Sequence, residues 1–420
     1  MRRSKNGWGA ALLTLLAIGA WIWAAAVAQW AGELAAGAEA YWSEAGVSPA
    51  QVDKAQRRAM EDGRSELPAL ALWREERDMW VRDGERQAKG GVLYLYGDGA
   101  LVWPARFLHG GYPPAGDGER AAISSALADA LWGGTEVVGR SVTLEGRTYH
   151  ISGVFQGGEP LLLAQDAGDS ETLYDHMVLL PSPGGMDSGE AILNGYGFPW
   201  TKLTDYPFYA WALTTLAFLP GLLLGLRLLL RLLRRGGLLR HSPVLLAQYA
   251  LPALGGMGLV LWAMGPGTEI PGRVIPTRWS DFSFWTQLAG ELMDEVGSIF
   301  TRVLSLREMR FWGMAALCVL LSLGALAFTA LWCERVRPDS LTEWWIGCAL
   351  SLGCVYLFAL STLGVGGLLV PRGLWLLPGL TITGEFCLLR HEKSLYANQT
   401  GREKHEEVFY EELEETLRNG

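Results

Sequence analysis

Long runs without charged residues alternate with polar segments along this chain and predict membrane-spanning helices. Five runs contain no Asp, Glu, Lys or Arg: residues 6–32, 206–226, 242–268, 311–333 and 344–371. Each reaches the roughly 20 residues that a helix needs to cross the hydrocarbon core of a bilayer. A sixth apolar segment, 367–389, carries Arg372 and Glu385 and is broken by Pro371 and Pro378, so the pattern predicts five or six spans.

The polar segment after the first run contains both helix and strand patterns. Residues 31–90 are rich in Ala, Glu, Arg and Gln and predict mostly helix, with 70–81 as a helix or an extended segment lying on a β core. The runs VLYLY and ALVW flank Gly97-Asp98-Gly99 and predict a β-hairpin over residues 91–104. Residues 177–180 predict a further strand, so we expect a mixed α+β domain.

The most distinctive pattern is at residues 123–155, which read ISSALADALWGGTEVVGRSVTLEGRTYHISGVF. Residues 121–132 predict a short helix, and Ser124 and Ser125 belong to its entry. Gly133 and Gly134 predict its end, because glycine adopts the left-handed conformation without a Cβ clash. A two-stranded unit follows, whose strand-forming residues flank a turn at Glu145-Gly146: Val142, Leu144, Tyr149, Ile151 and Val154.

This segment resembles the extracytoplasmic core domain of MacB/FtsX-type ABC transporter permeases, in which a helix of the form IS..LA..LWG precedes VVG..V.L.G..Y.I.GVF. The resemblance covers 123–155 closely and is looser in the segment before it, at Leu108, Gly110 and Asp117. It implies a homodimer, or a pair with a paralogous permease, that works with a separate cytoplasmic ABC ATPase. It also implies that movement of the ATPase is transmitted through the spans to the extracytoplasmic domain, with no catalytic residue in this chain.

The chain differs from that family's usual plan of four spans and one large exterior domain in its extra spans, in a second exterior piece and in the short segment before its first span. Only about seven residues precede the first span. Residues 269–310 form a second exterior piece, in which Ser280 is expected to cap an amphipathic helix that lies in the outer interface or packs under the main exterior domain. Its apolar positions recur at three and four: Phe282, Trp285, Leu288, Leu292, Val296, Ile299, Phe300 and Val303. These features favour an alternative, a membrane-anchored extracytoplasmic interaction or sensor protein without ATPase coupling.

Charge sets the expected orientation in a bacterial cell membrane. Basic residues cluster at 2–5, 227–240 and 335–337, which the positive-inside rule assigns to the cytoplasm. Residues 31–205 then face outside; they hold 14 Lys/Arg and 26 Asp/Glu, and 14 − 26 gives −12. Nucleic acid is not an expected partner, because its binding needs a basic face. The basic segment 227–241 is expected to anchor on anionic lipid, or, by the resemblance, to dock on an ATPase.

The expected fold class is therefore a polytopic α-helical membrane protein of five or six spans with a mixed α+β extracytoplasmic domain. Its parts are the first span (1–32), the extracytoplasmic domain (33–205), the second and third spans with the basic loop (206–268), the exterior amphipathic helix (269–310), the C-terminal spans (311–390) and an acidic tail (391–420). The tail is cytoplasmic with six spans and exterior with five.

The N-terminal run invites a second interpretation, because Ala26-Val27-Ala28 before Gln29 has the form of a signal-peptide cleavage site. The uncharged run is longer than the 7–15 apolar residues of a signal core, which favours a retained span.

Motifs for chemistry are absent from the sequence. It contains no P-loop, H-E-x-x-H, G-x-S-x-G or C-x-x-C pattern, so we expect no enzymatic activity and no cofactor. His109, His150 and His176 are too widely spaced to predict a metal site. Glu385 and Arg372 are the ionisable candidates at membrane depth. The five cysteines lie in or beside the later spans and are expected to act as small apolar residues at helix contacts.

Overall fold

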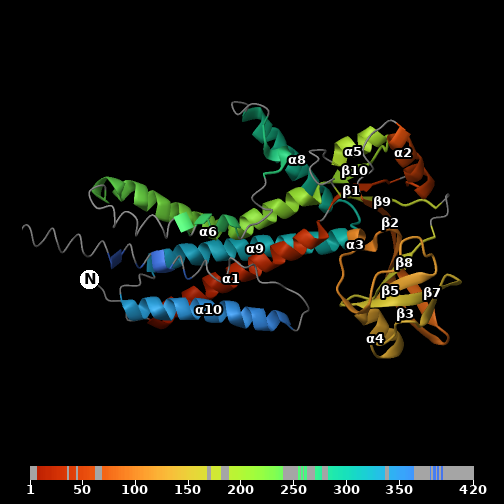
Figure 1. Cartoon of the computed structure of the whole chain (residues 1–420), viewed down its shortest axis with the longest axis horizontal. Coiled ribbons are helices and arrows are strands. Elements are labelled where there is room, and N and C mark those ends of the chain that lie inside the picture. The colour runs from red at the N-terminus through yellow and green to blue at the C-terminus, as the bar shows by residue number, and fades with distance from the viewer. Residues whose placement is uncertain are drawn as a thin grey trace, which may run out of the picture. The chain divides into compact units, whose positions relative to one another are not determined.

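The computed structural model describes residues 7–35, 37–43, 46–61, 69–167, 172–180, 189–239, 254–255, 257–258, 260–262, 270–276, 282–335, 340–363, 379, 382–384, 386 and 389–390 (Figure 1). The chain divides into two units. One, the helical unit, comprises residues 1–28, 213–269 and 316–420, and the other, the α+β unit, comprises residues 29–212 and 270–315.

Apolar residues build four long helices within the described part of the chain: α1 (Gly7–Leu34), α6 (Tyr206–Leu239), α9 (Leu306–Arg335) and α10 (Leu341–Leu363). By length and composition, each contains a segment able to cross a membrane: Leu12–Leu34, Tyr206–Arg227, Leu306–Trp332 and Leu341–Leu360. These four segments and the mixed sheet described below fit the expected fold class. The predicted span at 242–268 lies largely outside the described residues, as does the sixth at 367–389.

One predicted boundary is wrong. The charge-free run begins at residue 311, but α9 begins at Leu306 and its first turn contains Arg307, Glu308 and Arg310. A charge normally marks the end of an apolar run, because its burial in an apolar setting is costly. Here the protein itself supplies partners for the charges of this turn, as the next subsection describes.

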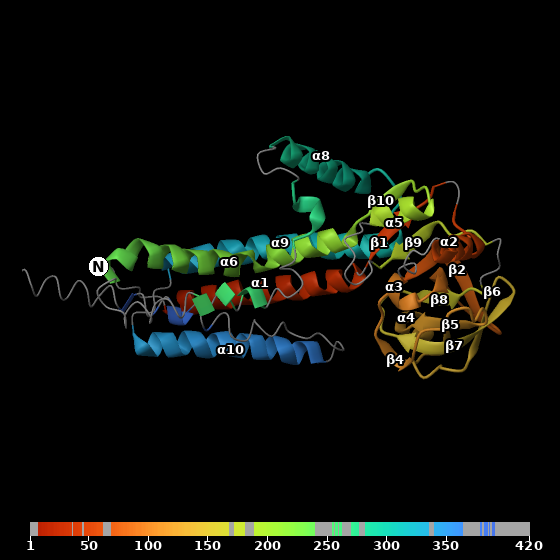
Figure 2. The ribbon, with the colours of Figure 1, turned by 45° about the horizontal axis from the view of Figure 1, so that its top comes forward.

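Within the helical unit, α1, α6 and α9 run side by side in both views (Figures 1 and 2). The ring of Trp21 on α1 meets that of Phe218 on α6 edge-on, with 6.4 Å between ring centres. Cys318 on α9 is buried, and its sulfur lies 3.6 Å from the carbonyl oxygen of Ala24 on α1. The expected role of this cysteine as a small residue at a helix contact is confirmed. Helix α1 also runs without a break through residues 26–28.

The α+β unit is built on one mixed sheet. Its strand order is β10-β1-β9-β2-β3-β8-β5-β7-β4, and β6 pairs with both β2 and β7. Most neighbours are antiparallel, whereas β3–β8 and β5–β7 are parallel. The strands are β1 (Ala38–Tyr41), β2 (Leu70–Asp83), β3 (Arg86–Gly97), β4 (Phe107–Gly110), β5 (Arg120–Ser124), β6 (Ser141–Leu144), β7 (Arg147–Phe155), β8 (Leu161–Gln165), β9 (His176–Leu179) and β10 (Lys202–Thr204).

Shorter helices accompany this sheet: α2 (Pro49–Glu61), α3 (Gly99–Val102), α4 (Ser125–Trp132), α5 (Gly189–Tyr196), the 3-10 turn η2 (Gly272–Val274) and α8 (Phe282–Ile299). Strand β2 contributes to two apolar cores, because successive side chains of a strand point to opposite faces. Leu72 packs with α2 and α5, and Trp73 packs with β3, β8 and α3. Both side chains are fully buried.

The expected hairpin at 91–104 is wrong, and so is the mostly helical interpretation of 31–90. For 70–81, the extended alternative is confirmed, because this segment forms most of β2. Strand β3 pairs with β2 along its length, Tyr96 lying opposite Leu72, and the turn between the two strands is at Gly84. Residues 99–102 instead form α3, because the side chain of Asp98 accepts a hydrogen bond from the Ala100 amide, 2.9 Å long. Of residues 31–90, only α2 and the end of α1 are helical among those described. Pairing across the sheet overrides the local helix propensity.

The pattern at 123–155 is largely confirmed. Helix α4 ends at Gly133, whose φ of 72° is left-handed, and β6 and β7 form a hairpin through Glu145 and Gly146. The helix begins later than residue 121, because 120–124 form β5, and Ser124 caps α4. The strand predicted at 177–180 is confirmed as β9. The expected exterior helix is present as α8, while Ser280, its expected cap, lies outside the described residues.

Candidate functional site

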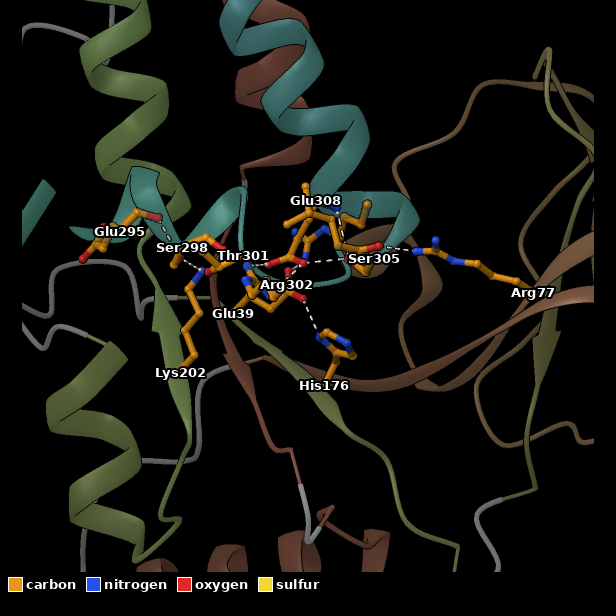
Figure 3. A network of polar contacts seen from close by, with 12 residues as sticks. Glu39, Arg77, His176, Lys202, Glu295, Ser298, Thr301, Arg302, Ser305 and Glu308 are labelled. Atoms are coloured by element: carbon orange, nitrogen blue, oxygen red, sulfur yellow. Dashed lines mark hydrogen bonds and ion pairs between the residues drawn. The ribbon is translucent and has the colours of Figure 1, made fainter. Parts of the chain in front are cut away.

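A cluster of buried polar side chains gathers where β1, β9 and the start of α9 meet (Figure 3). We name it the buried polar cluster and define it by six residues: Glu39, His176, Arg302, Ser305, Arg307 and Glu308. All six belong to the α+β unit. Buried charges are stable only when paired and hydrogen-bonded, so the partners of each charge define what this cluster does.

Arg307 is the centre of the cluster, with 1% of its surface exposed. One guanidinium nitrogen lies 2.7 Å from Oε2 of Glu39 on β1, and the other donates to the carbonyl oxygen of Leu34 at 2.8 Å. Leu34 is the last residue of α1, where backbone carbonyls lack helical partners and a cation is favoured. The guanidinium also lies 5.2 Å from the ring centre of Tyr206, the first residue of α6. One side chain therefore contacts β1 and the ends of two membrane-length helices.

Glu39 and His176 form a second buried pair. The Nδ1 atom of His176 lies 2.8 Å from Oε1 of Glu39. Burial alone would raise the pKa of Glu39, but the charge of Arg307 and the His176 hydrogen bond outweigh it, so the pKa lies below 4.5. Burial alone would lower the pKa of His176, but Glu39 outweighs it and raises this pKa above 6.5. Both shifts favour the charged forms, so the Glu39 carboxylate pairs with Arg307 and, when the imidazole is protonated, with His176 as well.

Aromatic packing fixes the orientation of His176. Its ring stacks on Trp73 of β2, with 4.0 Å between ring centres and 18° between the ring planes. The ring of Tyr41 on β1 lies on another side of the imidazole, with 4.9 Å between the ring centres. Because the imidazole is held between two strands, it points toward Glu39 (Figure 3).

A capping box closes the first turn of α9. Glu308 accepts a hydrogen bond from the Ser305 amide, and the Glu308 amide donates to Oγ of Ser305; both distances are 3.1 Å. This reciprocal arrangement satisfies two backbone amides that a helix start would leave free. Arg302 forms an ion pair with the same Glu308 carboxylate. Strand β2 also contacts this turn, since the Glu75 carboxylate accepts a hydrogen bond from the Leu306 amide at 2.7 Å. The start of α9 is therefore tied to both β1 and β2.

The histidines considered for a metal site do not come together. His109 and His150 are exposed on β4 and β7, whereas His176 is buried against Glu39. Within the described residues, no group of three or more His, Cys, Asp and Glu side chains is arranged to hold a metal ion. Glu385 and Arg372, the ionisable candidates at membrane depth, lie outside the described residues. The hydrogen bonds of the cluster join the first turn of α9 to β1 and to the end of α1.

The sequence-based search missed Glu39 and Arg307, the central pair of the cluster. One local signal was available: Ser305-x-x-Glu308 directly before an apolar run is the pattern of a capping box. It would have started the helix at Leu306 and marked Arg307 as a charge in a membrane-length helix. Its partner, 268 residues away in sequence, carries no such signal.

We expect stability to depend on pH through the pair of Glu39 and His176. Since the pKa of Glu39 is lowered, its contribution is present above pH 4.5 and is lost as the pH falls through the lowered value. Since the pKa of His176 is raised, its contribution is present below pH 6.5 and is lost as the pH rises through the raised value. The contribution of the pair is therefore greatest between pH 4.5 and 6.5.

Thermal unfolding of the purified chain at about pH 5.5 and about pH 8.5 measures this loss. His176→Gln should reduce the fall in midpoint between the two pH values, while His150→Gln, at an exposed position, should leave the fall unchanged. An equal fall in midpoint for the wild type and His176→Gln would rule out His176 as the source of the pH dependence.

The architecture defines a class: a helical membrane protein with an α+β domain that follows its first membrane-length helix. No family model and no curated protein matches the chain. Among solved structures, it is similar to the extracellular domain of the noncanonic ABC-type transporter YknZ from Gram-positive bacteria, with 14% identity, a TM-score of 0.30, and coverage of 40% of this chain and 97% of that one. It is also similar to the periplasmic region of MacB from Actinobacillus actinomycetemcomitans, with 9% identity, a TM-score of 0.33, and coverage of 40% and 88%.

Proposed function

We propose that this chain is the membrane-spanning, permease-like subunit of an ABC transporter complex. In this proposal a separate cytoplasmic ATPase binds and hydrolyses ATP, and the spans transmit its movement to the α+β unit outside the cell. The subunits act as a homodimer or as a pair with a paralogous permease. The output is efflux or control of an exterior partner, without passage of a substrate between the helices.

The observation that carries the proposal is the buried polar cluster. Arg307 lies in the first turn of α9 and binds both the end of α1 and strand β1. Glu75 of β2 binds the next backbone position, Leu306. Because these bonds are charge-assisted and those of Arg307 are buried, a displacement of α1 or α9 is expected to move the sheet with it instead of being absorbed in a loose linker. Such a junction suits mechanical transmission.

The segment at 123–155 supports the same assignment independently. Ser124 caps α4, Gly133 ends it, and the β6–β7 hairpin follows, in the order that the resemblance to MacB/FtsX-type permeases implies. The acidic balance of 31–205 and the arginines at 227–240 support an exterior α+β unit and a cytoplasmic segment within reach of an ATPase.

A detergent pull-down of the tagged, full-length chain from its native membrane tests the proposal. We expect a protein with a P-loop to co-purify in stoichiometric amount and to hydrolyse ATP. A second differently tagged copy, expressed together with the first, reports whether the chain pairs with itself. Repeated recovery of the chain without any P-loop protein would contradict the proposal and favour the membrane-anchored sensor.

A further inference from the structure

Helix α8 has an apolar face that the other described residues of the chain leave uncovered. Apolar residues recur at the spacing of one helix face, and none of the residues of α8 is buried. Met293 is 75% exposed and Phe282 79%, and the face continues beyond the helix through Phe300 at 86% and Val303 at 85%. We name this surface the α8 apolar face, with the following members: Phe282, Trp285, Met293, Val296, Phe300 and Val303.

The polar side of α8, in contrast, binds the rest of the α+β unit. Glu295 pairs with Arg273 at 2.7 Å and accepts a hydrogen bond from the hydroxyl of Tyr209. Ser298 accepts from Lys202 of β10 at 3.3 Å. A helix on a water-soluble domain buries its apolar stripe and turns its polar side to solvent. In α8 the polar residues Glu295 and Ser298 bind the unit while the α8 apolar face stays exposed, which indicates that this face has apolar surroundings.

The contacts of α8 place it at the ends of membrane-length helices. Its partner Tyr209 lies in the first turn of the segment Tyr206–Arg227, and Phe300 and Val303 directly precede the segment that begins at Leu306. Figure 2 shows α8 leading by a short link into α9. Residues at this level meet the boundary between headgroups and acyl chains, where Trp and other large apolar side chains are enriched.

We propose that the α8 apolar face lies in the outer interface of the bilayer and binds lipid. Amphipathic helices of this kind lie in the plane of the interface with the apolar face toward the acyl chains. Helix α8 contains no Lys or Arg, so burial of apolar area drives the contact and anionic headgroups are not required. The contact holds α8, and through Glu295 and Ser298 the start of α6 and strand β10, at a fixed depth. This inference does not depend on an ATPase.

Spin labelling of the full-length chain in nanodiscs of zwitterionic lipid, without nucleotide, tests the inference. Labels are attached at Met293→Cys on the α8 apolar face and, as a matched control, at Asp294→Cys, the next residue along the helix. The native cysteines are replaced, and each labelled protein is first shown to fold as the wild type does. Collision with dissolved oxygen and with a water-soluble nickel chelate reports whether a label is in lipid or in water.

The label at 293 is expected to lose access to the nickel chelate and to gain access to oxygen, whereas the label at 294 stays open to the chelate. Replacing zwitterionic lipid with anionic lipid should not change this contrast. Equal access of both labels to the chelate would overturn the inference, since the face would then lie in water. Loss of access to both probes at 293, with dipolar broadening between labels, would also overturn it and would assign the face to a second copy of the chain.

Discussion

Arg307→Met is expected to lower the free energy of unfolding of the α+β unit by about 3 kcal/mol, the lower end of the range for breaking a buried ion pair, because His176 still pairs with the Glu39 carboxylate. Glu39 is 3% exposed, so water cannot replace the lost guanidinium. The carbonyl of Leu34 loses its donor as well. Methionine preserves most of the side-chain volume, and the change therefore tests charge more than packing. Denaturant unfolding of the full-length chain in detergent, followed by tryptophan fluorescence, measures the effect.

Two further variants make this test specific. Arg120→Met removes an ion pair with Asp117 that is 3.0 Å long but solvent-exposed, and it should cost less than about 1 kcal/mol. Glu39→Gln combined with Arg307→Met should be less destabilised than Arg307→Met alone, because the buried carboxylate oxygen that loses its guanidinium partner is then no longer charged. If Arg307→Met costs no more than Arg120→Met, the cluster does not hold the start of α9.

Ser124→Ala is expected to cost about 2–4 kcal/mol, the sum of a lost helix cap and an unsatisfied buried donor. The hydroxyl of Ser124 accepts from the Leu127 amide at 3.2 Å and from the Leu161 amide at 2.9 Å. The side chain is fully buried, so no solvent reaches the two amides after the change. Ser124 thus joins α4 to β8 as well as capping the helix, and unfolding under the same conditions measures the loss.

Ser141→Ala is the matched control, because Ser141 is half-buried at the start of β6 and the change removes the same atom. It should shift the unfolding curve by much less than Ser124→Ala does. Similar costs for the two variants would show that the two hydrogen bonds of the Ser124 hydroxyl add nothing measurable to stability.

Features that depend on neighbouring residues could be predicted from the sequence. The turn at Glu145-Gly146 and the end of α4 at Gly133 follow from backbone preferences of residues within one turn. Charge-free runs located four membrane-length helices because the length of a span is fixed by the bilayer. In each case the information lies within a short window of sequence.

Features that depend on distant partners could not be predicted. Strand β2 is rich in charged residues and has the composition of a helix, yet its pairing with β3 and β9 makes it a strand. The charge-free run that predicts this span begins at residue 311, whereas α9 begins at Leu306 and contains Arg307 and Glu308 in its first turn. Their partners Glu39 and Arg302 come from other segments, so the cost of burying these charges cannot be judged from the apolar run alone.

Hydrogen exchange on the full-length chain, co-purified with its ATPase in nanodiscs, tests the central claim most directly. If the proposed mechanical transmission operates, a non-hydrolysable ATP analogue should change the exchange of amides in β1 and in the first turn of α9 in the wild type. The change should be much smaller in the doubly substituted Glu39→Gln/Arg307→Met chain. Identical exchange with and without the nucleotide, in a wild-type complex that hydrolyses ATP, would contradict mechanical transmission to the α+β unit.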